Sequence, residues 1–154
     1  MSIYNTPLEE RFGEKLEELR EGKNMTREQL ADQVGLTARH IAALERGERR
    51  PTLNTMEKLL RTQFPDLASK YVRQFALLFL DLQKKCDSAE ISTKALDLRG
   101  MLDALRLMRR GVAAGAALDM GITNKAFDSY EQGLIRDAIA ARIPAQLTAA
   151  KLFS

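Results

Sequence analysis

Apolar side chains recur along the chain at the spacing of an α-helix, with charged residues between them. Leu8, Phe12, Leu16 and Leu19 follow one another at intervals of three or four positions and are separated mainly by Glu and Lys. The same pattern predicts further helices over about 27–34, 38–45, 53–64, 67–85, 93–110, 113–120 and 129–141. No segment alternates apolar and polar residues over the length of a strand. The pattern therefore predicts an all-α protein.

Several of the predicted helices begin at a residue that can cap them. Thr26 can accept a hydrogen bond from the backbone of the first turn, and Gln29 can reach back to Thr26, which together make a capping box. Thr37 is expected to cap the helix over 38–45, and Ser92 the helix over 93–110. Gly35 should end the helix before Thr37, because glycine adopts turn conformations that other residues disfavour.

The pattern also divides the chain into parts. Pro65 interrupts the helical spacing, so a boundary is expected there. The segment 71–82 carries apolar residues around more than one face, which predicts a largely buried helix. We expect a helix-turn-helix bundle over 1–64, a buried linking helix over 65–90, a second small helical domain over 91–145 and a tail over 146–154.

The most specific feature is a pair of short predicted helices joined by a tight turn, residues 31–47 (ADQVGLTARHIAALERG). Val34, Ile41 and Leu44 can bury the inside of the elbow between the two helices, and Gly35 supplies the turn. The outer face of the second helix is then free to enter a DNA major groove, which is about 12 Å wide. The motif therefore points to DNA binding.

Residues 12–60 resemble the DNA-binding domain of the lambda-repressor/Cro (XRE-like) family, in the segments MTREQLA, VGLT, IAALERG and RRPTLNTMEKLL. The resemblance implies a sequence-specific transcription regulator, a repressor, that binds double-stranded DNA. We expect the helical C-terminal half to join two chains into a homodimer, because two motifs on neighbouring half-sites add their binding free energies. The positions that read bases in this family are here Ala38, Arg39, His40, Ala42 and Ala43. The positions that hold phosphates are here Arg27, Thr37, Arg46, Arg49 and Arg50.

The reading face departs from the family in its side chains. Alanine cannot donate a hydrogen bond and can at most touch a thymine methyl, which leaves Arg39 as the main direct reader, best suited to guanine. Glu45, beside Arg46 and Arg49, is expected to be their structural partner. We therefore expect modest base specificity and a strong dependence of affinity on salt.

The distribution of charge supports this orientation more than the net charge of +3 does. Residues 1–34 contain 5 Lys and Arg against 8 Asp and Glu, whereas residues 35–61 contain 6 against 3. Positive charge therefore begins where the predicted recognition helix begins. The preceding acidic helix is expected to face away from DNA.

The C-terminal half allows more than one interpretation. Residues 71–144, in phrases such as ALDMGITNKAFDSYEQ and IRDAIAARIP, resemble the helical lid of MoxR- or CbbQ-type AAA+ ATPases. The resemblance implies a lid without its catalytic core, which could serve as a dimerisation module or dock onto an AAA+ ATPase partner. An accessory protein of this kind is the alternative to a transcription regulator.

A competing interpretation is an internal repeat. A shift of 86 residues aligns Gly35 with Gly121 and Thr37 with Thr123, among 8 identities over the 36 positions 12–47. In that case Asn124 and Lys125 would belong to a second DNA-reading helix. We favour the lid-like module, because short patterns of Ala, Gly, Leu and Thr recur by chance.

The composition argues against an enzyme. His40 and Cys86 are the single histidine and cysteine, too few for a four-ligand zinc site without carboxylates, and no phosphate-binding glycine-rich loop is present. We therefore expect no catalytic residue, metal or cofactor. A single cysteine favours a reducing compartment. The apolar runs 75–80 and 112–118 are too short to span a membrane, and no secretory signal precedes the first helix, so we expect a cytoplasmic protein.

Overall fold

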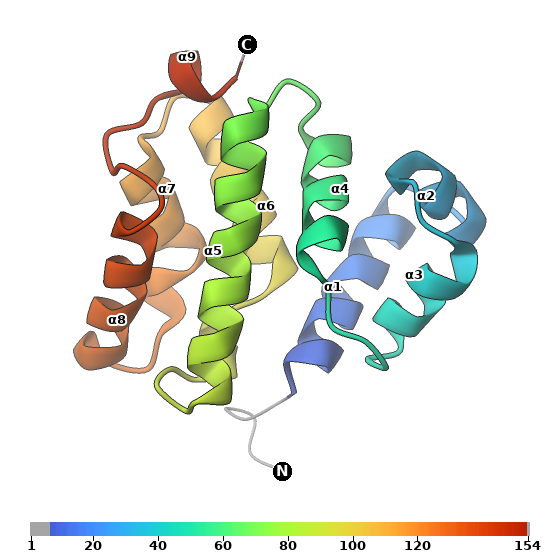
Figure 1. The fold of residues 1–154 in the computed structure, drawn as a ribbon, viewed down its shortest axis with the longest axis horizontal. Coiled ribbons are helices and arrows are strands. Elements are labelled where there is room, and N and C mark those ends of the chain that lie inside the picture. Colours follow the sequence, from blue (N-terminus) through green and yellow to red (C-terminus); the bar gives the residue numbers. More distant parts are fainter. Residues whose placement is uncertain (1–6, 154) are drawn as a thin grey trace.

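The structure, a computed structural model, describes residues 7–153, and every regular element in this range is helical (Figure 1). The elements are α1 (Leu8–Gly22), α2 (Arg27–Val34), α3 (Ala38–Glu45), α4 (Leu53–Gln63), α5 (Ser69–Asp87), the short 3-10 helix η2 (Thr93–Ala95), α6 (Leu98–Arg109), α7 (Ala114–Gly121), the 3-10 helix η3 (Thr123–Lys125), α8 (Ser129–Ala140) and α9 (Ala149–Leu152). The all-α prediction is confirmed. No helix in the described range has the length and apolar character needed to cross a membrane.

The helix starts near the N-terminal end follow from local hydrogen bonds. Thr26 Oγ1 accepts from the backbone N–H of Gln29 at 3.1 Å, and Gln29 Oε1 accepts from the N–H of Thr26 at 2.8 Å. Thr37 Oγ1 accepts from the N–H of His40 at 3.0 Å. Between these caps Gly35 adopts a left-handed φ of +81°, which ends α2 and turns the chain into α3. The capping box, the second cap and the turn are as predicted.

The first three helices meet closely because one residue of α1 lacks a side chain. α3 packs against both α1 and α2. A Cβ atom on Gly13 would lie 2.4 Å from the carbonyl oxygen of Leu44 and 2.6 Å from that of Glu45, which is closer than real Cβ contacts allow. The backbone of α1 therefore touches the backbone at the end of α3, and this contact fixes how α3 is presented.

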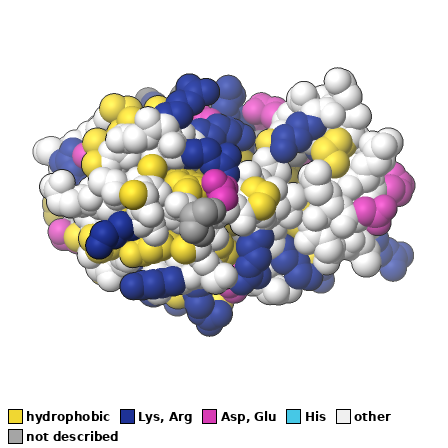
Figure 2. All heavy atoms as spheres, turned by 90° about the horizontal axis from the view of Figure 1, so that it is seen from above, with side chains coloured by type: hydrophobic (Ala, Val, Ile, Leu, Met, Phe, Trp, Pro, Cys, Tyr) yellow, Lys and Arg dark blue, Asp and Glu magenta, His cyan; other side chains and the backbone are white. Residues whose placement is uncertain are grey.

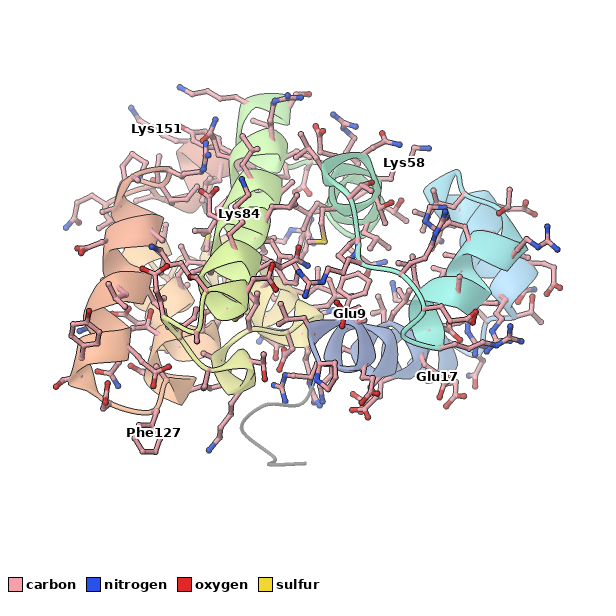
Figure 3. The ribbon with its side chains drawn as sticks, turned by 60° about the horizontal axis from the view of Figure 1, so that its bottom comes forward. Glu9, Glu17, Lys58, Lys84, Phe127 and Lys151 are labelled. Atoms are coloured by element: carbon pink, nitrogen blue, oxygen red, sulfur yellow. The ribbon has the colours of Figure 1, made fainter. Side chains whose placement is uncertain are left out.

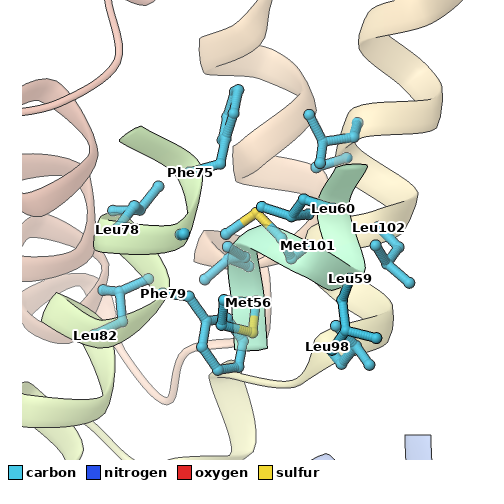
Figure 4. Close-up of a cluster of buried hydrophobic side chains, with 14 of the residues drawn as sticks. Met56, Leu59, Leu60, Phe75, Leu78, Phe79, Leu82, Leu98, Met101 and Leu102 are labelled. Atoms are coloured by element: carbon cyan, nitrogen blue, oxygen red, sulfur yellow. The ribbon is translucent and has the colours of Figure 1, made fainter. Parts of the chain in front are cut away.

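α5 stands between the N-terminal helices and α7 and α8 (Figure 1). A hydrophobic cluster draws buried side chains from α4, α5 and α6, among them Met56, Phe75 and Met101 (Figure 4). Phe12 of α1 meets Phe79 of α5 edge to face, with 6.0 Å between ring centroids. The same cluster continues into α7 and α8. The core is thus continuous across the boundaries expected near positions 64 and 90.

The start of α6 differs from the prediction. Ser92 does not cap a long helix: it precedes η2, and its hydroxyl has no hydrogen-bond partner within the described range. The cap of α6 is Asp97, whose Oδ1 accepts from the N–H of Gly100 at 2.7 Å and whose Oδ2 pairs with Arg11 at 3.2 Å. Asp97 is the better cap because its charge is also neutralised by Arg11, a long-range partner that the local pattern does not reveal.

The proposed internal repeat does not produce a second helix-turn-helix. Gly121 is not a left-handed turn residue. It ends α7 against α6, where a Cβ would lie 2.3 Å from the carbonyl oxygen of Gly100. The following residues form only η3 before α8 begins at Ser129, so no counterpart of α3 exists at positions 124–131. Lys125 pairs with Asp97 at 3.3 Å rather than extending as a reader.

The segment expected to be a tail, residues 146–154, packs against the core over its described part. Leu147 and Leu152 are buried. The N–H of Ala68 donates to the carbonyl oxygen of Leu152 at 2.8 Å, next to a bridge between Leu67 and Phe153. Burial of these apolar side chains ties the segment to the connection before α5. Residues 1–6 and 154 of the expected first and last parts lie outside the described range.

Candidate nucleic-acid interface

α2 and α3 form one end of the molecule, and one side of α3 faces solvent (Figure 1). Ile41 and Leu44 are fully buried on the inner side of α3. Arg39 is exposed on the outer side. The half-buried side chains of α3 are Ala38, His40, Ala42 and Ala43. Arg39 is therefore the one long, exposed donor among the predicted base-reading residues.

Glu45, the last residue of α3, is turned inward. Its side chain is 0% exposed and accepts from Arg20 Nε at 2.7 Å, from Arg20 Nη2 at 3.0 Å and from Arg27 Nε at 3.0 Å. The hydrogen bond to Glu45 raises the pKa of Arg20. Arg46 and Arg49 were expected to be the partners of Glu45, and this expectation is wrong, because α1 and α2 bring closer arginines to the buried carboxylate.

The turn after α3 carries exposed arginines of two kinds. Arg46 and Arg49 are exposed, and neither forms an ion pair within residues 7–153. Arg50, expected to hold a phosphate, pairs instead with Glu9 and with Asp87, whose Oδ2 and Oδ1 accept from Arg50 Nη1 and Nη2 at 2.7 Å each. These carboxylates raise the pKa of Arg50. Arg50 joins the turn to α1 and to the end of α5.

His40 lies within this positive environment. Burial, followed by the charges of Arg49 and Lys58, lowers the pKa of His40 below its ordinary value. The imidazole is therefore neutral at pH 7. A neutral ring next to these cations does not add to their mutual repulsion.

Three residues that position the interface were not found by sequence reasoning. Lys58 lies on the side of α4 facing the α2–α3 pair (Figure 3), and its Nζ donates to the carbonyl oxygen of Gly35 at 2.9 Å. Gly13 sets the approach of α1, and Arg20 pairs with Glu45. Arg20 could have been noticed, because it continues the apolar series of Phe12 and Leu16 at intervals of four residues. A charge on a buried helix face requires a partner.

Within the described range no group of three or more His, Cys, Asp and Glu side chains is placed to hold a metal ion. No curated protein and no solved structure matches the chain. Residues 16–62 match the family model described as helix-turn-helix, which covers the second half of α1, all of α2 and α3, and nearly all of α4. The capped helices, the left-handed turn at Gly35 and the outward face of α3 agree with this match, which supports a DNA-binding helix-turn-helix over residues 16–62.

Proposed function

We propose that the protein is a sequence-specific transcription regulator that inserts α3 into the major groove of duplex DNA. The supporting observation is the imbalance of charge on this face. Arg39, Arg46 and Arg49 are exposed without an ion-pair partner in the described range, whereas Glu45, the acidic residue of α3, is buried and already paired. With the exposed Glu48 of the same turn counted, the face is still positive and complementary to DNA. A repressor role rests on the resemblance to the lambda repressor and Cro.

Base reading is assigned mainly to Arg39. A guanidinium can donate two hydrogen bonds to guanine O6 and N7. Ala38, Ala42 and Ala43 can contribute only methyl contacts to thymine, and the neutral His40 at most one hydrogen bond. Such a face distinguishes few base pairs by direct contact. We therefore expect modest sequence preference.

Phosphate contacts are assigned to residues at both ends of α3. Arg46 and Arg49 follow its C-terminal end, and Thr37 precedes its N-terminal end with a hydroxyl that can still donate. Arg27 pairs with Glu45 through Nε, which leaves its two terminal nitrogens to reach a phosphate. Contacts of this kind fix the position of α3 on the duplex and make binding dependent on salt.

The experiment is selection of bound sequences from random duplex DNA by the full chain. Arg39→Ala should lose preference at one or two positions, at about tenfold in affinity for each. Arg49→Ala should weaken all sequences alike and reduce the slope of log affinity against log salt by about 0.9. Arg136→Ala, on α8 at the other end of the molecule, is the matched control. Enrichment of no sequence and an affinity indifferent to salt would contradict the proposal.

We also propose that the regulator acts as a homodimer. One such domain makes few base contacts, and two on half-sites about 34–36 Å apart add their binding free energies. Light scattering of the full chain, alone and with a palindromic duplex, tests this. A mass of one chain per duplex at saturating protein would contradict it.

A second candidate function, docking onto a protein partner such as an AAA+ ATPase, is favoured by one observation. Met120, Phe127 and Tyr130, in or beside the connection of α7 to α8, are 58%, 69% and 73% exposed. Large exposed side chains of these types are enriched at protein interfaces. They lie at the opposite end of the molecule from α3, so a protein partner bound there leaves α3 accessible (Figure 1).

Co-purification of the full chain with an AAA+ ATPase tests this candidate. Phe127→Ala with Tyr130→Ala should abolish the association without changing DNA affinity, whereas Lys84→Ala should change neither. An association that survives the double substitution would contradict docking at this end.

A further inference from the structure

Two adjoining hollows lie on the side of α1 that faces α6. The first, of about 350 Å³, is lined by residues of α1 and α6, with Leu19 and Leu102 among them. The second, also of about 350 Å³, lies where the C-terminal ends of α4 and α6 approach the turn after α1. Lys23 and Arg106 line both hollows, which therefore form one continuous depression.

The residues that line the depression carry a net positive charge. Its first part is lined by four cationic residues and one acidic residue, Glu18, and its second part by four cationic residues and no acidic one. Lys and Arg side chains gather near the upper edge of Figure 2, on the side where α6 lies behind α4 and α5 in Figure 1. The cationic residues are Lys15, Lys23, Arg99, Arg106, Arg109 and Arg110.

Nearby carboxylates offset only part of this charge. Glu18 pairs with Lys15 at 3.5 Å and with Arg99 at 3.8 Å. Asp103 pairs with Arg106 at 2.7 Å, and Asp66 with Arg109. Lys23 has a neutral partner, and Arg110 forms no ion pair within residues 7–153. Both side chains therefore keep their full charge toward the second hollow.

The groups around the second hollow are held in place before any ligand arrives. The guanidinium of Arg109 lies 4.9 Å from the ring centroid of Phe64 and 5.2 Å from that of Phe153. Lys23 Nζ donates to Gln63 Oε1 at 2.8 Å. Gln63 Nε2 is buried and has no hydrogen-bond partner in the described part of the chain. Because that nitrogen is shielded from solvent, the donors available to an anion in the hollow are the fixed cationic groups, which are suited to an ion that accepts several hydrogen bonds.

We infer that this depression binds a small organic phosphate of the nucleoside diphosphate class. The phosphates lie in the second hollow and at the junction formed by Lys23 and Arg106, where arginine can donate in pairs to phosphate oxygens. The organic part lies in the first hollow against Leu19, which is half-buried, whereas Leu102 beneath it is only 2% exposed. A ligand site of this kind combines apolar walls with a few converging polar groups. The site is separate from the DNA-binding face, because it lies on the side of α1 that faces α6 and not on the side that contacts α3.

Calorimetric titration of the full chain without DNA tests the inference, with ADP and inorganic pyrophosphate as probes at constant ionic strength. Lys23→Ala with Arg106→Ala is compared with Lys84→Ala with Lys151→Ala, which removes the same charge from α5 and α9 (Figure 3). Wild type and the control pair should bind ADP equally. The Lys23 and Arg106 pair should bind it at least about tenfold more weakly. Pyrophosphate, which lacks the organic part, should bind wild type more weakly than ADP does.

Other outcomes overturn the inference. The inference is wrong if wild type gives no heat of binding with ADP, or if both double variants lose ADP affinity equally. It is also wrong if pyrophosphate binds wild type as tightly as ADP does. Arg110→Ala, which breaks no ion pair in the described range, repeats the test if the double variant has a lowered melting temperature. If the depression binds duplex DNA instead, the Lys23 and Arg106 double variant loses DNA affinity and the wild-type protein does not bind ADP. Failure of DNA binding itself leaves the ADP titration unchanged, so the two proposals fail separately.

Discussion

Arg20 donates two hydrogen bonds to Glu45, at 2.7 and 3.0 Å, where the Glu45 side chain is wholly shielded from solvent. Arg20 lies on α1 and Glu45 ends α3, so the pair fastens the end of the recognition helix to the rest of the domain. Arg20 also donates to the carbonyl oxygen of Met25 at 2.9 Å, which secures the turn before α2. One arginine thus links three segments of the helix-turn-helix.

Glu45→Gln should destabilise the protein by about 3 kcal/mol, because it leaves the charge of Arg20 without its buried counterion. Arg27→Ala should cost only about 1 kcal/mol, since Arg20 still satisfies Glu45 and the Arg27 side chain is 33% exposed. Urea denaturation of the two variants measures both values. Equal losses would contradict the leading role assigned to Arg20.

Gly13→Ala should destabilise the protein by about 2 kcal/mol, because the added methyl meets the carbonyl oxygens at the end of α3 and forces the two helices apart. Gly22→Ala is the matched control, in the same helix. Nothing lies within 4 Å of a Cβ at Gly22, so this change should be neutral or stabilising by up to about 1 kcal/mol. Chemical denaturation separates the two. A tolerated Gly13→Ala would show that the contact between α1 and α3 can relax.

The stability of the protein should depend on pH through His40. The pKa of His40 is lowered in the folded state, so the unfolded chain binds the proton more readily. The contribution of the neutral His40 to the free energy of unfolding is therefore fully present above the unfolded pKa, near 6.5. This contribution falls as the pH drops below that value. His40→Gln should remove this part of the loss, and His40 is the single histidine. Melting temperatures of both proteins between about pH 8 and pH 5 measure it. If the melting temperatures of the two proteins fall with pH along parallel curves, the lowered pKa of His40 is contradicted.

Cys86 should react slowly with thiol reagents in the folded protein. Burial raises the pKa of its thiol to about 12, and Asp87 adds to the effect. The Sγ atom also lies 3.8 Å from the carbonyl oxygen of Ser92, to which it can donate. Labelling at pH 8 should become at least about tenfold faster in denaturant, where the thiol regains its ordinary pKa. Similar rates in both states would contradict this.

The exposed residues of the candidate site could be predicted from the sequence. The ion pairs that hold α3 and the turn after it in place could not. The position of Arg39 on α3 followed from the cap at Thr37, because a cap fixes which residues begin the helix. The ion pairs of Arg50 with Glu9 and Asp87 join residues 41 and 37 positions apart. No local pattern encodes such pairs, so the sequence did not show that Arg50 joins the turn after α3 to α1 and α5.

The sequence by itself determined the helical class, the capping box at Thr26, the left-handed turn at Gly35 and the bounds of α3. Each depends on hydrogen bonds and backbone preferences within about four residues. Only the tertiary structure decided that Asp97 caps α6, that Gly121 meets Gly100 in place of a second reading helix, and that residues 147–152 return to the core. These outcomes depend on which helices approach one another. Burial and charge pairing between distant segments set that approach, and a linear pattern does not record it.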